Sequence, residues 1–259
     1  MPSGYPELGQ DDLGELTGSF NRMAQALEAT EARRRELIGT VAHELRTPLT
    51  GMRGLTEGLL DGVFSIEEAA PDILREIRRL ERLTQELSLV TQAEAGIMSV
   101  VSRPVALGEI TRAALAQFER PFALRELELK LDVRQETVIQ VDADRLMQVL
   151  VNLLSNALRH TTVGGVRVQV DRLHRCGLVT VQDTGEGICE RDLPHVFERF
   201  YRSDQSRARD EDENVGVGLT VSQHLVEAMG GRISLSSQVS LGTTVTVEVP
   251  LATSGLLSD

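Results

Sequence analysis

Residues 38–63 read IGTVAHELRTPLTGMRGLTEGLLDGV, and their pattern decides the fold of the first third of the chain. The apolar residues recur three or four positions apart, which is the spacing of one face of an α-helix. They are Ile38, Val41, Leu45, Leu49, Met52, Leu55, Leu59 and Val63. Pro48 lies inside this run, so we expect a kink near Thr47.

A second amphipathic helix is predicted after a turn that begins at Asp61-Gly62 and that Pro71 helps to delimit. Its apolar face consists of Ile73, Ile77, Leu80, Leu83, Leu87 and Val90. Upstream of residue 38, a heptad seam suits a parallel coiled coil; its members are Leu13, Leu16, Phe20, Met23 and Leu27. Two antiparallel helices with one apolar stripe each cannot bury both stripes alone. We therefore expect two chains to combine into a four-helix bundle.

Past Arg103-Pro104, which we interpret as a linker, the pattern changes to a mixture of helices and strands. The predicted helices cover 107–123, 142–160 with Asp142 as N-cap, and 215–229; the predicted strands cover 127–133, 166–170, 178–182, 232–236 and 243–249. Residues 203–214 are expected to form a mobile loop. The resulting division is a linker over 1–33, a helical domain over 34–100, a mixed domain over 101–252 and a tail over 253–259.

Composition excludes several classes of protein. The chain has 259 residues, 41% of them hydrophobic and 25% charged, which is typical of a globular protein rather than a disordered one. A net charge of −12 argues against nucleic-acid binding over the whole surface of the protein. With 6 Phe, 2 Tyr and no Trp, the cores must be aliphatic. Two cysteines form no metal cluster or disulfide framework, and no apolar run approaches the roughly 18 residues of a membrane helix.

His43 is placed by helical periodicity on a solvent-exposed face. It lies about 200° around the helix from Val41 and from Leu45, opposite the apolar seam. Thr47 is one turn further along the same face, and Glu44 is adjacent. A lone exposed histidine is most often a solvated surface residue. Here an accessible imidazole stands beside a carboxylate that can hold or deprotonate it, as a histidine nucleophile requires.

Two later segments carry polar residues that suit a nucleotide. Asn152 and Asn156 are four residues apart on one helical face, with Arg159 further along, and an amide oxygen with a nearby cation suits Mg²⁺ and a triphosphate. Asp183 shares strand parity with two valines expected to be buried, so its carboxylate needs a hydrogen-bond donor such as the amino group of adenine. Both segments also have ordinary interpretations, as polar residues on a helix surface and as an Asx turn.

Glycines and arginines further along could contact phosphate. Gly216 and Gly218 precede a predicted helix, where backbone N–H groups favour phosphate. Residues 197–202 read FERFYR and could anchor a loop while aiming guanidinium groups at phosphate. The alternatives are a glycine-rich helix entry and two core phenylalanines with solvated charges between them.

Taken in order, these segments resemble the cytoplasmic part of a bacterial sensor histidine kinase of a two-component system, of the HisKA plus GHKL-ATPase type. Residues 43–49 resemble the H box, 152–160 the N box, 183–187 the Asp-x-Gly-x-Gly loop, 197–200 the F box and 216–219 the second glycine box. Residues 11–16 with 20–23 are similar to the second helix of a HAMP linker. The resemblance implies a multidomain α and α+β fold. A helical-hairpin dimer forms a four-helix bundle and is followed by an α/β sandwich of the GHKL (Bergerat) ATPase type, with a mixed sheet and three helices.

The resemblance also implies roles for individual residues. ATP and Mg²⁺ would bind the C-terminal domain, and the γ-phosphoryl group would move to His43, with Glu44 as general base. Thr47 would orient water for dephosphorylation of the partner, Asn156 would hold Mg²⁺, and Asp183 would recognise adenine. The other implied nucleotide-binding residues are Asn152, Arg159, His160, Gly185, Gly187, Arg199, Arg202, Gly216, Gly218, Leu219 and Thr243.

The partners implied by the resemblance are a second copy of the chain and the receiver domain of a response regulator, which would accept the phosphoryl group on an aspartate. No nucleic-acid partner is expected. We expect a cytoplasmic portion of a bacterial inner-membrane receptor, attached to the membrane only through a missing N-terminal sensor and transmembrane region.

Two alternatives to an active kinase remain. Asn214 stands where the second glycine box usually opens with glycine, and acidic residues cover 210–213. Both features favour a binding module that dimerises, holds nucleotide and docks a regulator without phosphorylating itself. The other alternative is a different ATPase of the same superfold, such as a chaperone or mismatch-repair type; a histidine segment on a dimerising hairpin argues against it.

Overall fold

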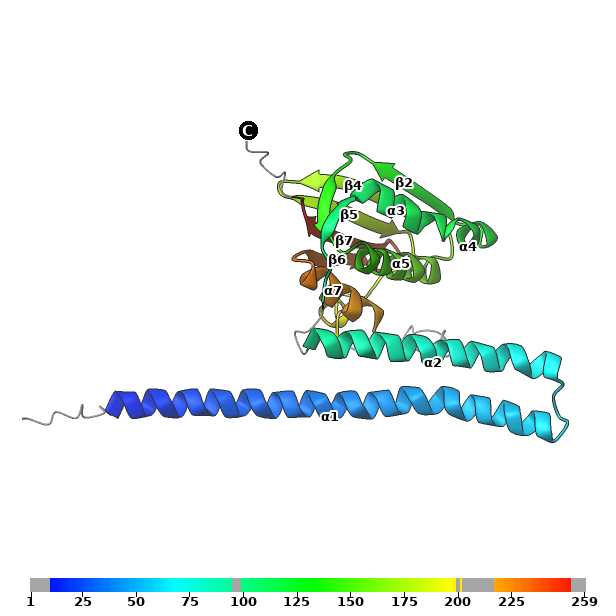
Figure 1. The fold of residues 1–259 in the computed structure, drawn as a ribbon, viewed down its shortest axis with the longest axis horizontal. Helices are drawn as coiled ribbons and strands as arrows, with labels where there is room; N and C mark the ends of the chain where they lie inside the picture. The colour runs from blue at the N-terminus through cyan, green and yellow to red at the C-terminus, as the bar shows by residue number, and fades with distance from the viewer. Residues whose placement is uncertain (1–9, 95–98, 199–200, 202–216, 253–259) are drawn as a thin grey trace, which may run out of the picture. The chain divides into compact units, whose positions relative to one another are not determined.

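A computed structural model of the chain describes residues 10–94, 99–198, 201 and 217–252 (Figure 1). Two compact units are present, Met1–Leu80 and Glu81–Asp259. The first contains most of a helical hairpin, whose second helix ends at Glu94, and the second contains a mixed α/β domain; the pattern of the sequence predicted both kinds of fold. None of the described helices has an apolar stretch of the length that a membrane span needs.

The hairpin consists of α1 (Gln10–Leu60) and α2 (Ile66–Glu94). At the end of α1, Gly62 has φ +70°, and the N–H of Val63 donates to the carbonyl of Gly58 at 2.8 Å. This conformation favours glycine because it has no Cβ. A capping box starts α2: the N–H of Ser65 donates to Glu68 Oε2 at 2.8 Å, and the N–H of Glu68 donates to Ser65 Oγ at 3.3 Å. Local residues thus specify both ends of the turn: Gly62 where α1 ends and the Ser65–Glu68 capping box where α2 begins.

Two prolines lie inside these helices. Helix α1 continues through Pro48 as one element, although proline has no N–H to donate to the carbonyl of Glu44. The expectation that Pro71 helps to delimit the turn is wrong, because Pro71 lies inside α2. The capping box at Ser65 begins the helix before Pro71 is reached.

A five-stranded mixed sheet forms one layer of the second unit, with the order β2-β4-β5-β7-β6. Its strands are β2 (Glu128–Val133), β4 (Gly165–Leu173), β5 (Cys176–Asp183), β6 (Arg232–Gln238) and β7 (Gly242–Pro250). Strands β2 and β4 are parallel and the other neighbouring pairs are antiparallel. The register places Val179 opposite Val247 and Val181 opposite Val245, so these buried valines share one face.

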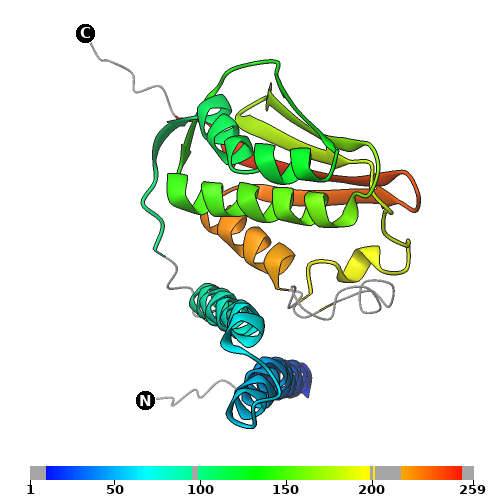
Figure 2. The same ribbon diagram turned by 90° about the vertical axis from the view of Figure 1, so that its right-hand side faces the viewer.

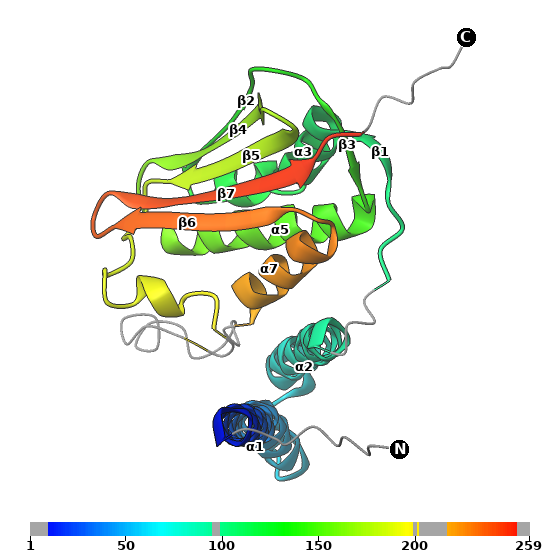
Figure 3. The ribbon, with the colours of Figure 1, turned by 90° about the vertical axis from the view of Figure 1, so that its left-hand side faces the viewer.

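Helices form the second layer, on one face of the sheet (Figures 2 and 3). They are α3 (Leu107–Ala116), α4 (Glu119–Leu124), α5 (Ala143–His160) and α7 (Gly218–Ala228). Asp142 caps α5 as predicted, since Oδ1 accepts from the N–H groups of Asp144 and Arg145. Among the described residues, Phe122 is the one aromatic side chain in the core between the layers, which is otherwise mainly aliphatic. The core includes Leu107, Leu146, Val149, Leu150, Leu154, Val168, Val170, Leu225, Val247 and Val249.

Two local expectations need correction, and a third cannot be compared with the structure. The single helix predicted over 107–123 is two helices, because Pro121 has no N–H to donate to the carbonyl of Gln117 and the chain turns there. Arg103-Pro104 is not a linker but part of β1 (Arg103–Ala106), which pairs with β3 (Val138–Val141) in a separate antiparallel sheet. The last helix begins at Gly218; the predicted start at 215 and the predicted loop over 203–214 lie outside the described residues.

Candidate functional site

His43 is exposed on α1, as helical periodicity predicted. Glu44 follows it and is partly exposed. One turn along, the hydroxyl of Thr47 donates to the carbonyl oxygen of His43 at 3.4 Å, which is a long and weak contact. The hydroxyl oxygen keeps its lone pairs for accepting a hydrogen bond. An accessible imidazole, a carboxylate and a hydroxyl therefore come together on one stretch of helix.

Glu44 also has a partner that the local sequence did not indicate. Arg79 of α2 places Nη2 3.7 Å from Glu44 Oε2, and its own side chain is only 6% exposed. The two residues are 35 positions apart, so nothing in the pattern around either one pointed to the other. The folding of the hairpin brings them together.

Helix α5 carries four of the predicted residues: Asn152, Asn156, Arg159 and His160. Asn152 Nδ2 donates to Ser222 Oγ of α7 at 2.7 Å, which ties the two helices together. A Cβ on Gly218 would lie 2.5 Å from Asn152 Oδ1, so a larger residue where α7 begins would displace the Asn152 side chain. Asn152, Asn156, Arg159, Gly218 and Ser222 line one pocket.

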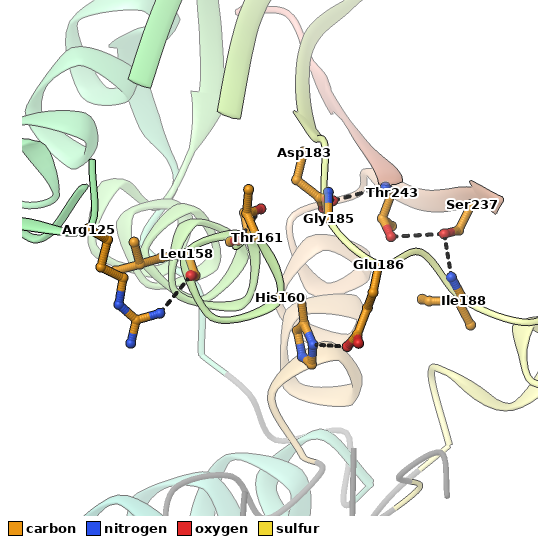
Figure 4. A network of polar contacts seen from close by, with 11 residues as sticks. Arg125, Leu158, His160, Thr161, Asp183, Gly185, Glu186, Ile188, Ser237 and Thr243 are labelled. Atoms are coloured by element: carbon orange, nitrogen blue, oxygen red, sulfur yellow. Dashed lines mark hydrogen bonds and ion pairs between the residues drawn. The ribbon is translucent and has the colours of Figure 1, made fainter. Parts of the chain in front are cut away.

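Asp183 ends strand β5 and is buried, as its strand parity predicted. Its Oδ1 accepts from the N–H of Gly185 at 2.8 Å and from the N–H of Thr243 at 3.0 Å (Figure 4). Burial raises the pKa of the Asp183 carboxyl, while these two N–H groups and His160 lower it and Glu186 raises it. Both hydrogen bonds from described residues reach Oδ1, which leaves Oδ2 for a ligand that donates.

The glycines of the loop after β5 make room for neighbouring backbone. A Cβ on Gly185 would lie 2.3 Å from the carbonyl oxygen of His160. Gly187 has φ +70°, and a Cβ there would lie 2.1 Å from the carbonyl oxygen of Gln238. Neither approach is possible with a side chain, so the loop packs against α5 on one side and β6 on the other.

A pair of side chains joins this loop to the end of α5. His160 Nδ1 lies 2.9 Å from Glu186 Oε1, and the N–H of Glu186 donates to the His160 carbonyl at 3.2 Å. Beyond Gly187, the N–H of Ile188 donates to Ser237 Oγ, whose hydroxyl is 2.9 Å from Thr243 Oγ1 (Figure 4). The network connects α5, the Asp183 loop and strands β6 and β7.

Not every predicted residue can be placed. Arg199, Arg202 and Gly216 lie outside the described residues, as do Asn214 and the acidic residues of 210–213. Leu219 is the second residue of α7 and is partly buried. Next to it, Thr220 Oγ1 donates to the carbonyl of Phe197 at 2.8 Å, which ties Phe197 to α7. Sequence reasoning missed Arg79, Glu186, Ser222 and Ser237, because each matters through a partner distant in sequence.

A helical hairpin with an exposed histidine, joined to an α/β sandwich with a buried aspartate in a glycine loop, defines a class of two-domain phosphotransfer proteins. Family models agree with this class. The His Kinase A (phospho-acceptor) domain matches residues 33–96, and the histidine kinase-, DNA gyrase B- and HSP90-like ATPase matches residues 141–253. These two matches cover more than half of the chain.

Comparisons with individual proteins support the same class. The chain is 34% identical to the signal transduction histidine-protein kinase BaeS of Escherichia coli and 30% identical to the sensor histidine kinase YclK of Bacillus subtilis. Each comparison covers 93% of this chain, but only 52% of BaeS and 53% of YclK. The chain thus spans about half the length of these relatives.

Among solved structures, the histidine kinase AdeS of Acinetobacter baumannii matches with a TM-score of 0.69 at 26% identity, over 81% of this chain and 98% of AdeS. ThkA, solved in complex with its response regulator TrrA, shares the fold with a TM-score of 0.62 at 22% identity, over 88% of this chain and 66% of that one. The chain belongs to the sensor histidine kinases of bacterial two-component systems. Its second domain is an ATPase domain of the type that binds ATP.

Proposed function

We propose that this chain transfers the γ-phosphoryl group of ATP to His43 and from there to an aspartate of a response-regulator receiver domain. The observation that carries the proposal is Asp183. Its buried carboxylate is held through one oxygen by two backbone N–H groups, which leaves the other oxygen for the amino group of adenine. The family of the chain and the exposed His43 beside Glu44 support it further.

The chemistry at His43 is a displacement at phosphorus. A ring nitrogen of His43 attacks the γ-phosphorus, a P–N bond forms, the P–O bond to the β-phosphate breaks, and ADP leaves. Glu44 accepts the proton that the ring loses. In the second transfer, a carboxylate oxygen of the regulator's aspartate attacks the same phosphorus, and the P–N bond breaks.

For the nucleotide, we propose contacts from the loop after β5 and from the α5–α7 pocket. Asp183, Gly185, Gly187 and Thr243 would hold the adenine end, since the N–H groups of Gly185 and Thr243 both donate to Asp183 and Gly187 belongs to the same loop. The remaining contacts, toward the phosphates, would come from Asn152, Arg159, His160, Gly218 and Leu219, with Arg199, Arg202 and Gly216 joining them.

Mg²⁺ fits the donor set of α5. Asn156 offers an amide oxygen at the pocket, and no hydrogen bond joins its side chain to another residue in the described parts of the chain. Those parts also hold no cluster of three or more His, Cys, Asp or Glu that could bind a metal. An ion carried by one protein oxygen with phosphates and water is the usual arrangement for Mg²⁺. Bound in this way, Mg²⁺ would neutralise charge on the transferring phosphate.

We also propose that the working form is a homodimer. Large apolar side chains of the hairpin stay exposed in a single copy: Phe20, Met23, Ile38, Leu49 and Leu74 are each at least half exposed. Burial of such a stripe against a second copy is the expected solution. Light scattering at tens of micromolar should give twice the chain mass of 28.4 kDa. A monomeric mass would contradict the four-helix bundle.

For the organisation along the chain, we keep the division predicted from the sequence as a proposal. We propose a linker of HAMP type over 1–33, the dimerisation and phosphotransfer domain over 34–100, the ATP-binding domain over 101–252 and a tail over 253–259. In this proposal the kinase region works in the cytoplasm and receives its signal through the linker helix.

A direct test of the proposed function is incubation with γ-labelled ATP and Mg²⁺, followed by acid treatment of the labelled protein. An active kinase takes up label that is lost in acid and kept in base, as phosphohistidine requires. Nucleotide binding without such label would support the alternative of a non-phosphorylating binding module.

Thr47 separates two activities on one helix face. We propose that its hydroxyl orients water for dephosphorylation of the regulator, a role that needs both donor and acceptor capacity. Thr47→Ala should slow dephosphorylation at least about tenfold, while autophosphorylation stays within about twofold. Both rates are measured on one preparation, and Thr47→Ser should recover the lost activity.

The matched control for this variant is Thr56→Ala. Thr56 Oγ1 donates to the carbonyl of Met52 at 2.7 Å, the same i to i−4 contact that Thr47 makes with His43. If Thr47 matters only through its backbone contact or by easing the chain into Pro48, its two activities should fall together or not at all. Equal loss of both rates in Thr47→Ala would refute the water-orienting role.

A further inference from the structure

Arg79 is a buried charged side chain of the hairpin. It belongs to α2, is 5% exposed, and lies between two carboxylates. Nη2 is 3.7 Å from Glu44 Oε2 of α1, and Nη1 is 3.9 Å from Glu76 Oε2 one turn back on α2. A buried guanidinium is retained only with partners, because its desolvation is costly. The three groups therefore act as one cluster that spans both helices.

The two carboxylates stand in different relations to Arg79. Glu76 is three residues away on the same helix, and its Oε2 is buried without a hydrogen bond to a described residue. Glu44 comes from the other helix and is the residue next to His43. The guanidinium is a rigid planar fork, so holding one edge beside Glu76 directs the other edge toward Glu44.

Resting on the proposed function, we infer that Arg79 is a positioning residue for the phosphoryl transfer, because it holds the carboxylate of Glu44 in place beside His43. The separation of 3.7 Å is that of an ion pair rather than a hydrogen bond. The oxygens of Glu44 therefore stay able to accept the proton of the imidazole. Without Arg79, the carboxylates of Glu44 and Glu76 are left without a cation between them. The Glu44 side chain then turns toward solvent, where water can hydrate its charge.

The primary test is a double-mutant cycle on autophosphorylation. Glu44→Gln should lower kcat about 100-fold, and Arg79→Gln about tenfold, with KM for ATP changed less than about twofold because the nucleotide binds in the other domain. In the Glu44→Gln background, Arg79→Gln should change kcat by less than about twofold, since it acts through Glu44. Arg79→Lys, which keeps the charge but not the fork, should recover part of the loss.

A second variant separates positioning from folding. Arg79→Gln alone leaves the Glu76 carboxylate buried without its cation, which destabilises the hairpin. A fair comparison with wild type therefore requires that the charge of Glu76 is removed as well. Arg79→Gln with Glu76→Gln removes both, and its thermal unfolding temperature should return toward that of wild type. If Arg79 positions Glu44, kcat stays low in this stable double variant. Recovery of kcat together with stability would overturn the inference.

Arg75→Gln is the matched control. Arg75 lies one turn from Arg79 on α2 and pairs with Asp72 at 2.9 Å, but its side chain is 51% exposed. The Arg75→Gln variant should take up label from γ-labelled ATP at the same rate as wild type. Additive losses of kcat in Arg79→Gln and Glu44→Gln would also overturn the inference, while leaving the role of His43 untouched. Loss of the proposed function itself would be seen separately, as label that persists after His43→Gln.

Discussion

His43→Gln should abolish acid-labile labelling by γ-labelled ATP, while affinity for ATP stays within about threefold of wild type. Glutamine has no nucleophilic ring nitrogen, so no P–N bond can form. His43 is exposed, and its side chain forms no hydrogen bond or ion pair with another described residue, so the variant should unfold at the wild-type temperature. Label is followed in a filter assay after acid and base treatment, and affinity is followed by calorimetry.

The control uses another exposed histidine of the chain. His174 lies in the turn between β4 and β5 with φ +53°, a conformation that asparagine also tolerates. His174→Asn should therefore keep both fold and label. Acid-labile label that persists on His43→Gln, or that is lost from His174→Asn at unchanged stability, would contradict the assignment of His43 as phosphoacceptor.

Asp183→Asn should weaken ATP binding at least about 100-fold without unfolding the domain. The asparagine oxygen can still accept from the N–H groups of Gly185 and Thr243, which now hold Asp183 Oδ1. Its amide nitrogen is a donor and would face the donating amino group of adenine where a carboxylate oxygen accepted before. Calorimetry measures the affinity, and unchanged affinity would refute the role in adenine recognition.

The pKa of Asp183 adds a prediction about stability without nucleotide. Burial raises this pKa above the ordinary value of 3.8, so the folded state binds the proton more tightly than the unfolded state. The stability that this group contributes is present below pH 3.8 and is lost as the pH rises through the raised pKa. At pH 7 Asp183→Asn should therefore be at least as stable as wild type, and its relative stability should decrease toward pH 4.

Urea unfolding at the two pH values measures this difference, because other groups titrate equally in both proteins. Asp132→Asn is the control: Asp132 is half exposed beside Arg134 on the surface of β2 and should change neither ATP affinity nor the pH dependence. A variant Asp183→Asn that is less stable than wild type at pH 7 would show that the charge of Asp183 holds the loop together.

Local sequence determined much of the fold, since several helices and strands are specified by residues within or next to them. The apolar period of α1 placed His43 in solvent, the N-cap at Asp142 started α5, and the parity of β5 placed Asp183 on the buried face. These features depend on neighbours within one or two turns or strand repeats, where geometry follows directly from residue spacing. The order of five short motifs along the chain was enough to predict the family.

Tertiary structure decided what depends on residues far apart in the chain. Strand β1 is four residues long and exists because β3 pairs with it from about 35 residues away, which no local pattern indicates. Asn152 reaches Ser222 across 70 residues, Asp183 receives the N–H of Thr243 across 60, and Arg79 reaches Glu44 from the other helix of the hairpin. Sequence by itself thus predicted which residues carry the chemistry, and it determined that His43 faces solvent and Asp183 the core. The partners that hold them came only with the fold, because hydrogen bonds and ion pairs form between atoms that packing brings within reach.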